Sequence, residues 1–335
     1  MNTISEGTPI RFALVGAGGI GLSHLEALSG VEGAQLAAVV ESREATGDAV
    51  AAERRVRCFH DYRDPELLPL VDAVILCTPP NQHHPMAKHF LLAGKHVLCE
   101  KPLTLHAAEA EELAELAEKE RLLLMMASKF RYVDDIIKAK AIVETGLLGQ
   151  IVLFENSFCG KVLMKDRWNS RAAVSGGGVL IDNGTHAVDI ARYLLGPLGD
   201  VQAQNGISAQ GLEVEDTARI QFRTKKGVIG LIDLSWSINK ESEHYLSIFG
   251  TAGTLLVGWK GSRYRQDGSA QWVPFGAGYN KVQSLRRQLQ NFCNVLRGKE
   301  LPIIGTTDAI ASVRAIESAY TSAGANHWLP VGGPA

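Results

Sequence analysis

The sequence predicts an α/β protein of two domains, the first with a doubly wound parallel sheet and the second an α+β domain with a large, mainly antiparallel open sheet. Its 335 residues exceed the roughly 250 at which a single hydrophobic core stops growing. Short apolar runs alternate with helical spacing in the first third, whereas polar and apolar residues alternate in much of the second half. We place the boundary so that the domains are residues 1–127 and 128–335.

The first domain is predicted from continuous apolar strands separated by helices, a pattern typical of a parallel sheet covered on both faces. Each apolar run is too short for a helix, and each intervening segment has helical spacing. The expected strands are 10–15, 36–40, 73–77, 97–99 and 122–126, and the expected helices are 22–28, 45–54, 85–93 and 107–118.

The second domain is predicted from period-two alternation and turn signals. Ala218, Ile220 and Phe222 alternate with polar residues, and Lys226-Gly227 marks a hairpin turn. An open sheet with helices on one face leaves the other face to be covered, so we expect a homodimer or homotetramer formed through this sheet. The expected strands are 151–154, 218–222, 228–236, 245–249 and 254–257, and the expected helices are 134–144, 282–296 and 308–323.

Composition excludes several classes of partner. A formal charge of −2 with no basic run gives little to hold a polyanion, so nucleic acid is not an expected partner. No apolar run approaches the roughly 20 residues that span a bilayer, and the first residues lack the order of a signal peptide. The five cysteines have no paired spacing. We therefore expect a cytoplasmic protein with reduced cysteines and no membrane contact.

A glycine-rich turn follows the first strand and opens the first helix, which is the context required of a dinucleotide-binding Rossmann turn. Gly16 permits the sharp turn, Gly18 lets the backbone approach a pyrophosphate, and Gly21 lets the helix pack on the strand. A structural turn without a ligand is the alternative. The residues expected to contact the cofactor here are Gly16, Gly18, Gly19, Ile20 and Gly21.

The end of the second strand bears on the choice of cofactor. Glu41 lies about 20 residues after the last glycine, where a carboxylate accepts hydrogen bonds from the adenosine ribose and repels a 2′-phosphate. NAD is therefore favoured. Arg43, with Ser42 in the same loop, leaves NADP open because a guanidinium can hold that phosphate.

Several later motifs occur in one order along residues 10–260. Glu100-Lys101-Pro102 ends the fifth strand, Gly176-Gly177-Gly178 precedes an Asp182-x-x-x-His186 pattern, and Phe249-Gly250-Thr251 begins a late hairpin. Together they resemble the Gfo/Idh/MocA oxidoreductase family. The resemblance implies a Rossmann domain, a C-terminal domain with a large open sheet, and an often cis Lys-Pro bond.

The resemblance also implies roles for individual residues. Lys101, Asp182 and His186 correspond to the family's catalytic group, and His84 to a histidine of the cofactor loop. Each of these three catalytic candidates could instead have a purely structural role: a strand-end charge for Lys101, a helix N-cap for Asp182 and a buried packing residue for His186. The further residues expected to contact the cofactor are Thr78, Pro79, Pro80, Asn81, His84, Glu100 and Lys101.

The chemistry of these residue types suits oxidation of a secondary alcohol. The cofactor accepts the hydride, a histidine accepts the proton, and an ammonium favours the developing alkoxide. A small polyhydroxylated molecule is the expected substrate. His83, His84 and His89 lack further ligands at suitable spacing, so no metal is expected. The expected substrate contacts are Lys101, Lys129, Arg131, Trp168, Asn169, Asp182, Asn183 and His186.

The leading hypothesis is an NAD(P)-dependent dehydrogenase or reductase acting on a sugar, a cyclitol or a nucleotide-linked sugar. One alternative keeps its cofactor tightly bound and carries out net epimerisation, elimination or coupled oxidoreduction. A second alternative is a non-catalytic NAD-binding regulator. Sequence motifs do not distinguish the first two, and the complete lysine, aspartate and histidine set argues against the third.

Overall fold

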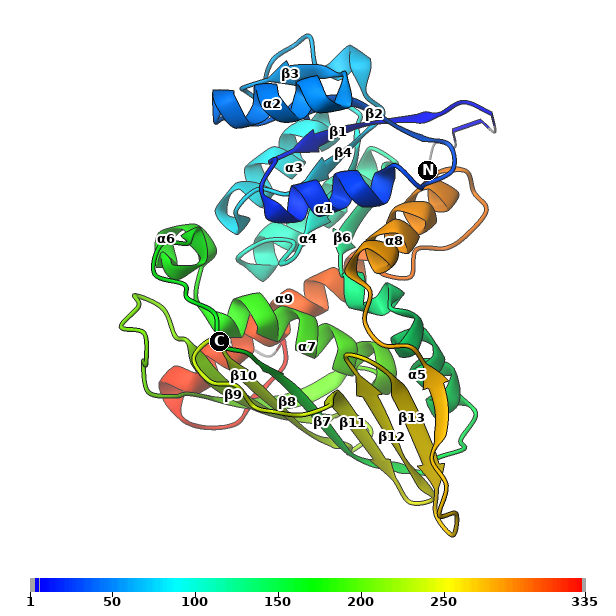
Figure 1. Cartoon of the computed structure of the whole chain (residues 1–335). Coiled ribbons are helices and arrows are strands. Elements are labelled where there is room, and N and C mark those ends of the chain that lie inside the picture. The colour runs from blue at the N-terminus through cyan, green and yellow to red at the C-terminus, as the bar shows by residue number, and fades with distance from the viewer. Residues whose placement is uncertain (1–3, 6, 333–335) are drawn as a thin grey trace. The chain divides into compact units, whose positions relative to one another are not determined.

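The computed structural model describes residues 4, 5 and 7–332, and its contacts divide the chain into two compact units (Figure 1). The first unit contains the residues up to 129 together with 281–310, and the second contains 130–280 together with the residues from 311 onward. The sequence places 281–310 in the second domain, whereas in the structure this segment packs with the first.

The first unit contains a six-stranded parallel sheet in the order β3-β2-β1-β4-β5-β6. This confirms the doubly wound class, in which the strand order reverses next to β1. Every residue of β4, β5 and β6 is buried, as expected for a sheet with both faces covered. The strands are β1 (Ile10–Val15), β2 (Ala34–Val40), β3 (Arg57–Phe59), β4 (Ala73–Leu76), β5 (His96–Glu100) and β6 (Leu124–Ala127).

Helices connect these strands, and α8 joins them from the far end of the chain. The helix α8 packs on α1, and its buried Phe292 lies 5.9 Å from Phe12 of β1, measured between ring centroids. The helices of this unit are α1 (Gly19–Leu28), α2 (Glu44–Arg54), α3 (His83–Leu92), α4 (Ala107–Lys119) and α8 (Lys281–Leu296), with 3-10 turns η1 (Leu68–Leu70) and η2 (Pro80–Gln82).

The second unit contains a nine-stranded sheet in the order β14-β13-β12-β11-β7-β10-β9-β8-β15. The pairing is antiparallel except between β7 and β10. Along β9 the buried residues alternate with more exposed ones, as predicted. The strands are β7 (Ile151–Cys159), β8 (Leu198–Asn205), β9 (Thr217–Thr224), β10 (Ile229–Ser235), β11 (His244–Gly250), β12 (Gly253–Gly258), β13 (Ser262–Gln266), β14 (Val273–Gly276) and β15 (Leu329–Pro330).

Helices α5 and α7 contact this sheet. In Figure 1, α5, α7 and α9 lie over one face of it. The opposite face carries half-exposed apolar side chains, among them Leu153 of β7 and its registered neighbour Ile229 of β10. The helices are α5 (Asp134–Glu144), α6 (Ala172–Ser175), α7 (Val179–Leu195) and α9 (Thr306–Ala325), with 3-10 turns η3 (Lys129–Tyr132) and η4 (Trp168–Ser170); η3 and α9 cross the unit boundaries.

Across residues 4, 5 and 7–332, no helix combines the length and apolar character that a bilayer-spanning helix needs.

Replacing Phe292 with Ala should destabilise the first unit by about 3–5 kcal/mol, because it removes a fully buried ring from between α8 and the sheet. Denaturant unfolding monitored by fluorescence and circular dichroism measures the loss. Leu301→Ala is the matched control, since Leu301 lies in the same segment but is 85% exposed. A loss below about 1 kcal/mol for Phe292→Ala would contradict the placement of α8 in the core of this unit.

Candidate cofactor and catalytic site

The glycine turn after β1 is shaped by close approach of other backbone atoms. Gly16 has a φ of +93°, and a Cβ there would lie 2.7 Å from the carbonyl oxygen of Cys77. A Cβ at Gly21 would lie 2.1 Å from the carbonyl oxygen of Gly16. These two positions therefore require glycine for the packing of α1 on the sheet.

Gly18 and Gly19, unlike Gly16 and Gly21, are not required by close packing. A Cβ at either would meet no atom within 4 Å, so the space above the start of α1 is open. Among the described residues, no side chain caps this helix at Gly18. The free amide groups and the positive end of the helix dipole at this point fit a pyrophosphate, as the sequence predicts.

Glu41, at the end of the second strand, lies against the glycine turn. Its Oε2 accepts a hydrogen bond from the Ala17 amide at 2.9 Å, and its side chain is 6% exposed. Arg43 binds it in a bidentate manner, with Nε 2.9 Å from Oε1 and Nη2 3.0 Å from Oε2. Burial raises the pKa of Glu41, but the hydrogen bonds from Arg43 and Ala17 outweigh it and lower the pKa to about 2. The carboxylate is thus ionised, and the Arg43 guanidinium is engaged with it.

The turn after β4 contains the predicted Thr78-Pro79-Pro80-Asn81 segment and is held by a histidine. The ring nitrogens of buried His83 lie 2.9 Å from the Thr78 carbonyl oxygen and 2.7 Å from that of Pro102. His83 therefore ties this turn to the Lys101–Pro102 peptide bond, which is cis. His84 instead lies 2.8 Å from Glu112 of α4. Of the two histidines, His83 is the one that holds the turn, and the role of His84 in binding the cofactor stays a prediction.

Glu100, at the carboxyl end of β5, faces α1. Its Oε1 lies 2.9 Å from Nε2 of His24, and both side chains are buried. Burial raises the pKa of Glu100. The His24 hydrogen bond and the nearby charges of Lys129 and Lys101 outweigh burial, so the pKa of Glu100 lies below its usual value. This geometry gives Glu100 a positioning role between β5 and α1. It also places the two lysines close enough to act on one carboxylate.

In the second unit, the start of α7 depends on a residue that the sequence interpretation did not select. The helix begins after Gly178, and Oε1 of Glu215 accepts hydrogen bonds from the amides of Gly178 and Leu180, both at 3.0 Å. Tyr320 donates to the same oxygen at 2.8 Å. A carboxylate at a helix N-terminus satisfies free amides and opposes the dipole.

The glycines before α7 make this cap sterically feasible. A Cβ at Gly178 would lie 1.9 Å from the backbone oxygen of Glu215, and one at Gly177 would lie 1.9 Å from the Tyr320 hydroxyl. Gly176 and Gly177 also have positive φ values of +78° and +159°. The glycine run thus lets the segment around Glu215 and helix α9 pack against the start of α7. The three successive glycines are the sequence signal that could have predicted this close packing.

Asp182 and His186 both lie on α7, four residues apart, so they face the same side of the helix. Because the helix begins at Val179 after Gly178, Asp182 is not its N-cap. Asp182 is half-buried, and Asn169 donates to its Oδ2 at 3.4 Å. His186 is 7% exposed, and its ring lies edge-on to Phe130 with centroids 5.0 Å apart.

The remaining predicted substrate contacts divide by burial. Arg131 is buried, and its guanidinium binds the Asp189 carboxylate, with Nη2 2.7 Å from Oδ1, which favours a structural role. Asn183 donates to the Phe158 carbonyl at 3.4 Å. Trp168 is 37% exposed on η4, next to half-buried Asn169.

The second unit also has a pocket of about 740 Å³ along β11 to β14, lined by Trp259, His244 and Arg263 among others. Asp182 and His186 are not part of its lining.

The first unit therefore has the architecture of a dinucleotide-binding domain, and the second is an α+β domain that presents a carboxylate and an imidazole on one helix. Comparison with protein families is consistent with both. Residues 10–128 match the oxidoreductase family with an NAD-binding Rossmann fold, and residues 136–256 match the GFO/IDH/MocA C-terminal domain. The chain belongs to the Gfo/Idh/MocA family of oxidoreductases, as the motifs suggested.

Relatives with specific names include an inositol dehydrogenase and a rhizopine catabolism protein. The chain is 29% identical to myo-inositol 2-dehydrogenase of Thermotoga maritima over 74% of its own length and 75% of the relative's. It is 27% identical to the rhizopine catabolism protein MocA of Rhizobium meliloti, over 93% and 94%. Two uncharacterised oxidoreductases of Schizosaccharomyces pombe are 37% and 35% identical, but the chain spans only about half of their length.

Solved structures share the fold. Levoglucosan dehydrogenase in complex with NADH and levoglucosan superposes with a TM-score of 0.87 at 19% identity, over 97% of this chain and 99% of that one. The WlbA dehydrogenase of Bordetella pertussis in complex with NADH and UDP-GlcNAcA gives 0.86 at 22% identity, over 99% and 100%.

Replacing Glu41 with Gln should lower stability at pH 7, and the loss should vanish on acidification. A carboxyl whose pKa falls from 4.5 unfolded to about 2 folded stabilises the protein above pH 4.5 and loses that contribution as the pH falls towards 2. The difference in free energy of unfolding between the wild type and Glu41→Gln should therefore shrink between these values, as measured by denaturant titration at several pH values.

The control is Asp61→Asn, which breaks the solvent-exposed pair with Arg63 and should cost little at any pH because solvent screens such pairs. A constant difference between wild type and Glu41→Gln from pH 7 to pH 3 would contradict the ionised, buried carboxylate.

Proposed function

We propose that this protein is an NAD(P)-dependent dehydrogenase that transfers a hydride between the nicotinamide and a secondary alcohol or ketone of a sugar, a cyclitol or a nucleotide-linked sugar. The observation that carries the proposal is helix α7, which presents Asp182 and His186 on one side of a firmly capped N-terminus. The open glycine turn of the first unit supports the binding of a dinucleotide in that unit.

The chain's own residues would manage the proton and the substrate oxygen. His186 would accept the hydroxyl proton, since imidazole titrates near neutral pH when unperturbed. Asp182 would orient the hydroxyl, and the Lys101 ammonium would donate to the same oxygen and favour its developing negative charge. The nicotinamide, when bound, supplies the hydride acceptor or donor.

NAD is the cofactor we favour over NADP. The Glu41 carboxylate is ionised and close to the turn, so it suits ribose hydroxyls and repels a 2′-phosphate. Arg43 is engaged with that carboxylate rather than available for a phosphate. One relative at 29% identity is named an NADP⁺-dependent scyllo-inositol 2-dehydrogenase, so the preference needs assays with both cofactors.

The names of relatives and neighbours support the proposed substrate class: inositol dehydrogenases, a rhizopine catabolism protein and a levoglucosan dehydrogenase. All of these names refer to polyhydroxylated rings or their derivatives. Lys129, Asn169 and Trp168 remain proposed contacts to the further hydroxyls.

Replacing His186 with Ala should lower kcat about a hundredfold or more, because the proton acceptor is lost. NADH or NADPH absorbance, followed with inositols, free sugars and sugar nucleotides, measures it. His327→Ala, an exposed histidine of the same unit, should leave kcat unchanged. Turnover at the wild-type rate in His186→Ala would refute the role. Turnover by desalted protein without added cofactor would indicate that the cofactor stays bound.

We also propose that the protein forms a homodimer or homotetramer through the open face of the second sheet, where Leu153 and Ile229 lie side by side and half-exposed. Light scattering at micromolar concentration should give a multiple of 36.2 kDa. Replacing both residues with Asp should shift the mass towards the monomer. A monomeric wild type would reject this proposal.

A further inference from the structure

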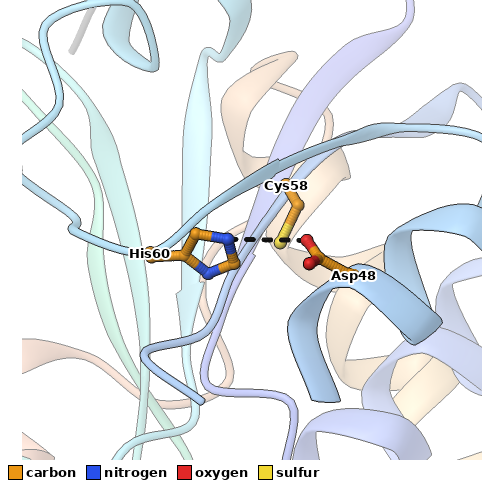
Figure 2. A group of neighbouring side chains, drawn as sticks. All are labelled: Asp48, Cys58 and His60. Carbon is orange, nitrogen blue, oxygen red and sulfur yellow. Dashed lines mark ion pairs between the residues drawn. The ribbon is translucent and has the colours of Figure 1, made fainter. Parts of the chain in front are cut away.

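Three side chains with metal-binding donor atoms converge at the edge of the first unit's sheet. Asp48 lies on α2, Cys58 on the edge strand β3, and His60 directly after that strand. One donor atom from each lies within 4.8 Å of the others. Figure 2 shows the sulfur, the imidazole and the carboxylate directed towards a common point.

The local fold explains why these atoms meet. Cys58 and His60 are two residues apart on an extended segment, so their side chains leave the same face. Helix α2 packs on β3 and brings Asp48 to that face. Gly47 permits the close approach, because a Cβ there would lie 2.9 Å from the Cys58 sulfur.

The His60 ring is oriented by a second contact. Its Nδ1 lies 3.0 Å from the backbone oxygen of Glu41, which can only accept a hydrogen bond, so Nδ1 carries a proton. Nε2 is then the nitrogen that faces Asp48, at 3.4 Å from its Oδ1. A carbonyl that fixes the far nitrogen of a histidine is a common outer contact in metal sites.

The spacing suits a small tetrahedral ion. Zinc bonds to nitrogen and oxygen of roughly 2.0–2.1 Å place two such ligands about 3.3 Å apart around a tetrahedron. The observed 3.4 Å between Nε2 and Oδ1 matches this separation. A thiolate and an imidazole together favour zinc over magnesium or calcium, which prefer oxygen ligands.

A nucleophilic relay and a surface ion pair both account for this cluster less well than a metal site. A relay of cysteine, histidine and carboxylate uses opposite ring nitrogens for the thiol and the carboxylate, yet Nδ1 here is engaged by Glu41. A surface ion pair accounts for Asp48 and His60 alone, which are 64% and 39% exposed. The Cys58 thiol also interacts with the Asp48 carboxylate, so all three donor groups form one cluster.

We propose that Asp48, Cys58 and His60 form a zinc-binding site, with water completing the tetrahedron on the exposed side. Binding replaces the thiol proton, which is released to solvent, by a zinc–sulfur bond. The ion would link α2 to the edge strand next to Glu41. The proposal does not depend on the enzymatic activity proposed above.

The test uses tag-free, chelator-treated full-length protein. Zinc affinity is measured by competition with a chromophoric chelator, and cobalt(II) is added separately to observe the near-ultraviolet charge-transfer band of a cobalt–thiolate bond. Wild type should bind one equivalent of zinc and show the band. Zinc should also raise the melting temperature, because it binds the folded state.

Cys58→Ser should abolish the cobalt band, and His60→Ala and Asp48→Asn should each weaken zinc binding at least about tenfold. Cys159→Ser, which changes another partly exposed cysteine, is the control and should behave as wild type. Circular dichroism checks that each variant is folded. Equal zinc affinity in Cys58→Ser, or a wild type without the cobalt band, would overturn the proposal.

Discussion

Close approach of other residues to a glycine is the constraint on which the starts of helices α1 and α7 both depend. At α1, Gly16 and Gly21 let the turn, the helix and the end of β4 come together, which leaves the first amides facing open space. At α7, Gly177 and Gly178 admit Tyr320 and the 215 segment. The two helix starts then diverge: one keeps its amides free for an anion, and the other has them satisfied by Glu215.

This difference fits the work proposed for each helix. A free N-terminus can bind a diphosphate through its amides and dipole. A capped N-terminus cannot, but its first turns are fixed in place, and Asp182 and His186 lie on those turns. Preorganisation of this kind is what holds catalytic groups within the narrow tolerance that chemistry needs.

Most of the fold was accessible from the sequence because the strands of the first domain are continuous apolar runs and its helices have regular periodicity. The exceptions have physical causes. The strand β3 has only three residues, one of them charged, and β13 consists of Ser262, Arg263, Tyr264, Arg265 and Gln266, in which no apolar period is visible. The parallel pairing of β7 with β10 depends on a long crossover, which local pattern does not specify.

The site was predicted less completely, because motifs identify residue types but not their partners. Asp182 and His186 are predicted from their resemblance to the family's Asp-x-x-x-His pattern, whereas Glu215 acts through a contact with the start of α7 about 37 residues earlier. Between the neighbours His83 and His84, only the direction of the helix decides which ring contacts Thr78. The group of Asp48, Cys58 and His60 combines a helix and an edge strand that was not predicted.

Because residues 281–310 pack with the first unit, that unit is completed by a segment synthesised after residues 130–280 of the second. Translation delivers β1 and α1 before residues 130–280 of the second unit, but their partner Phe292 emerges only after those residues. Until then the apolar surface of α1 that α8 will cover is exposed on a growing, ribosome-bound chain. The nucleotide-binding unit therefore cannot complete its core until a segment encoded after residues 130–280 of the second unit has been synthesised, and nascent-chain chaperones have a defined surface to shield in the interval.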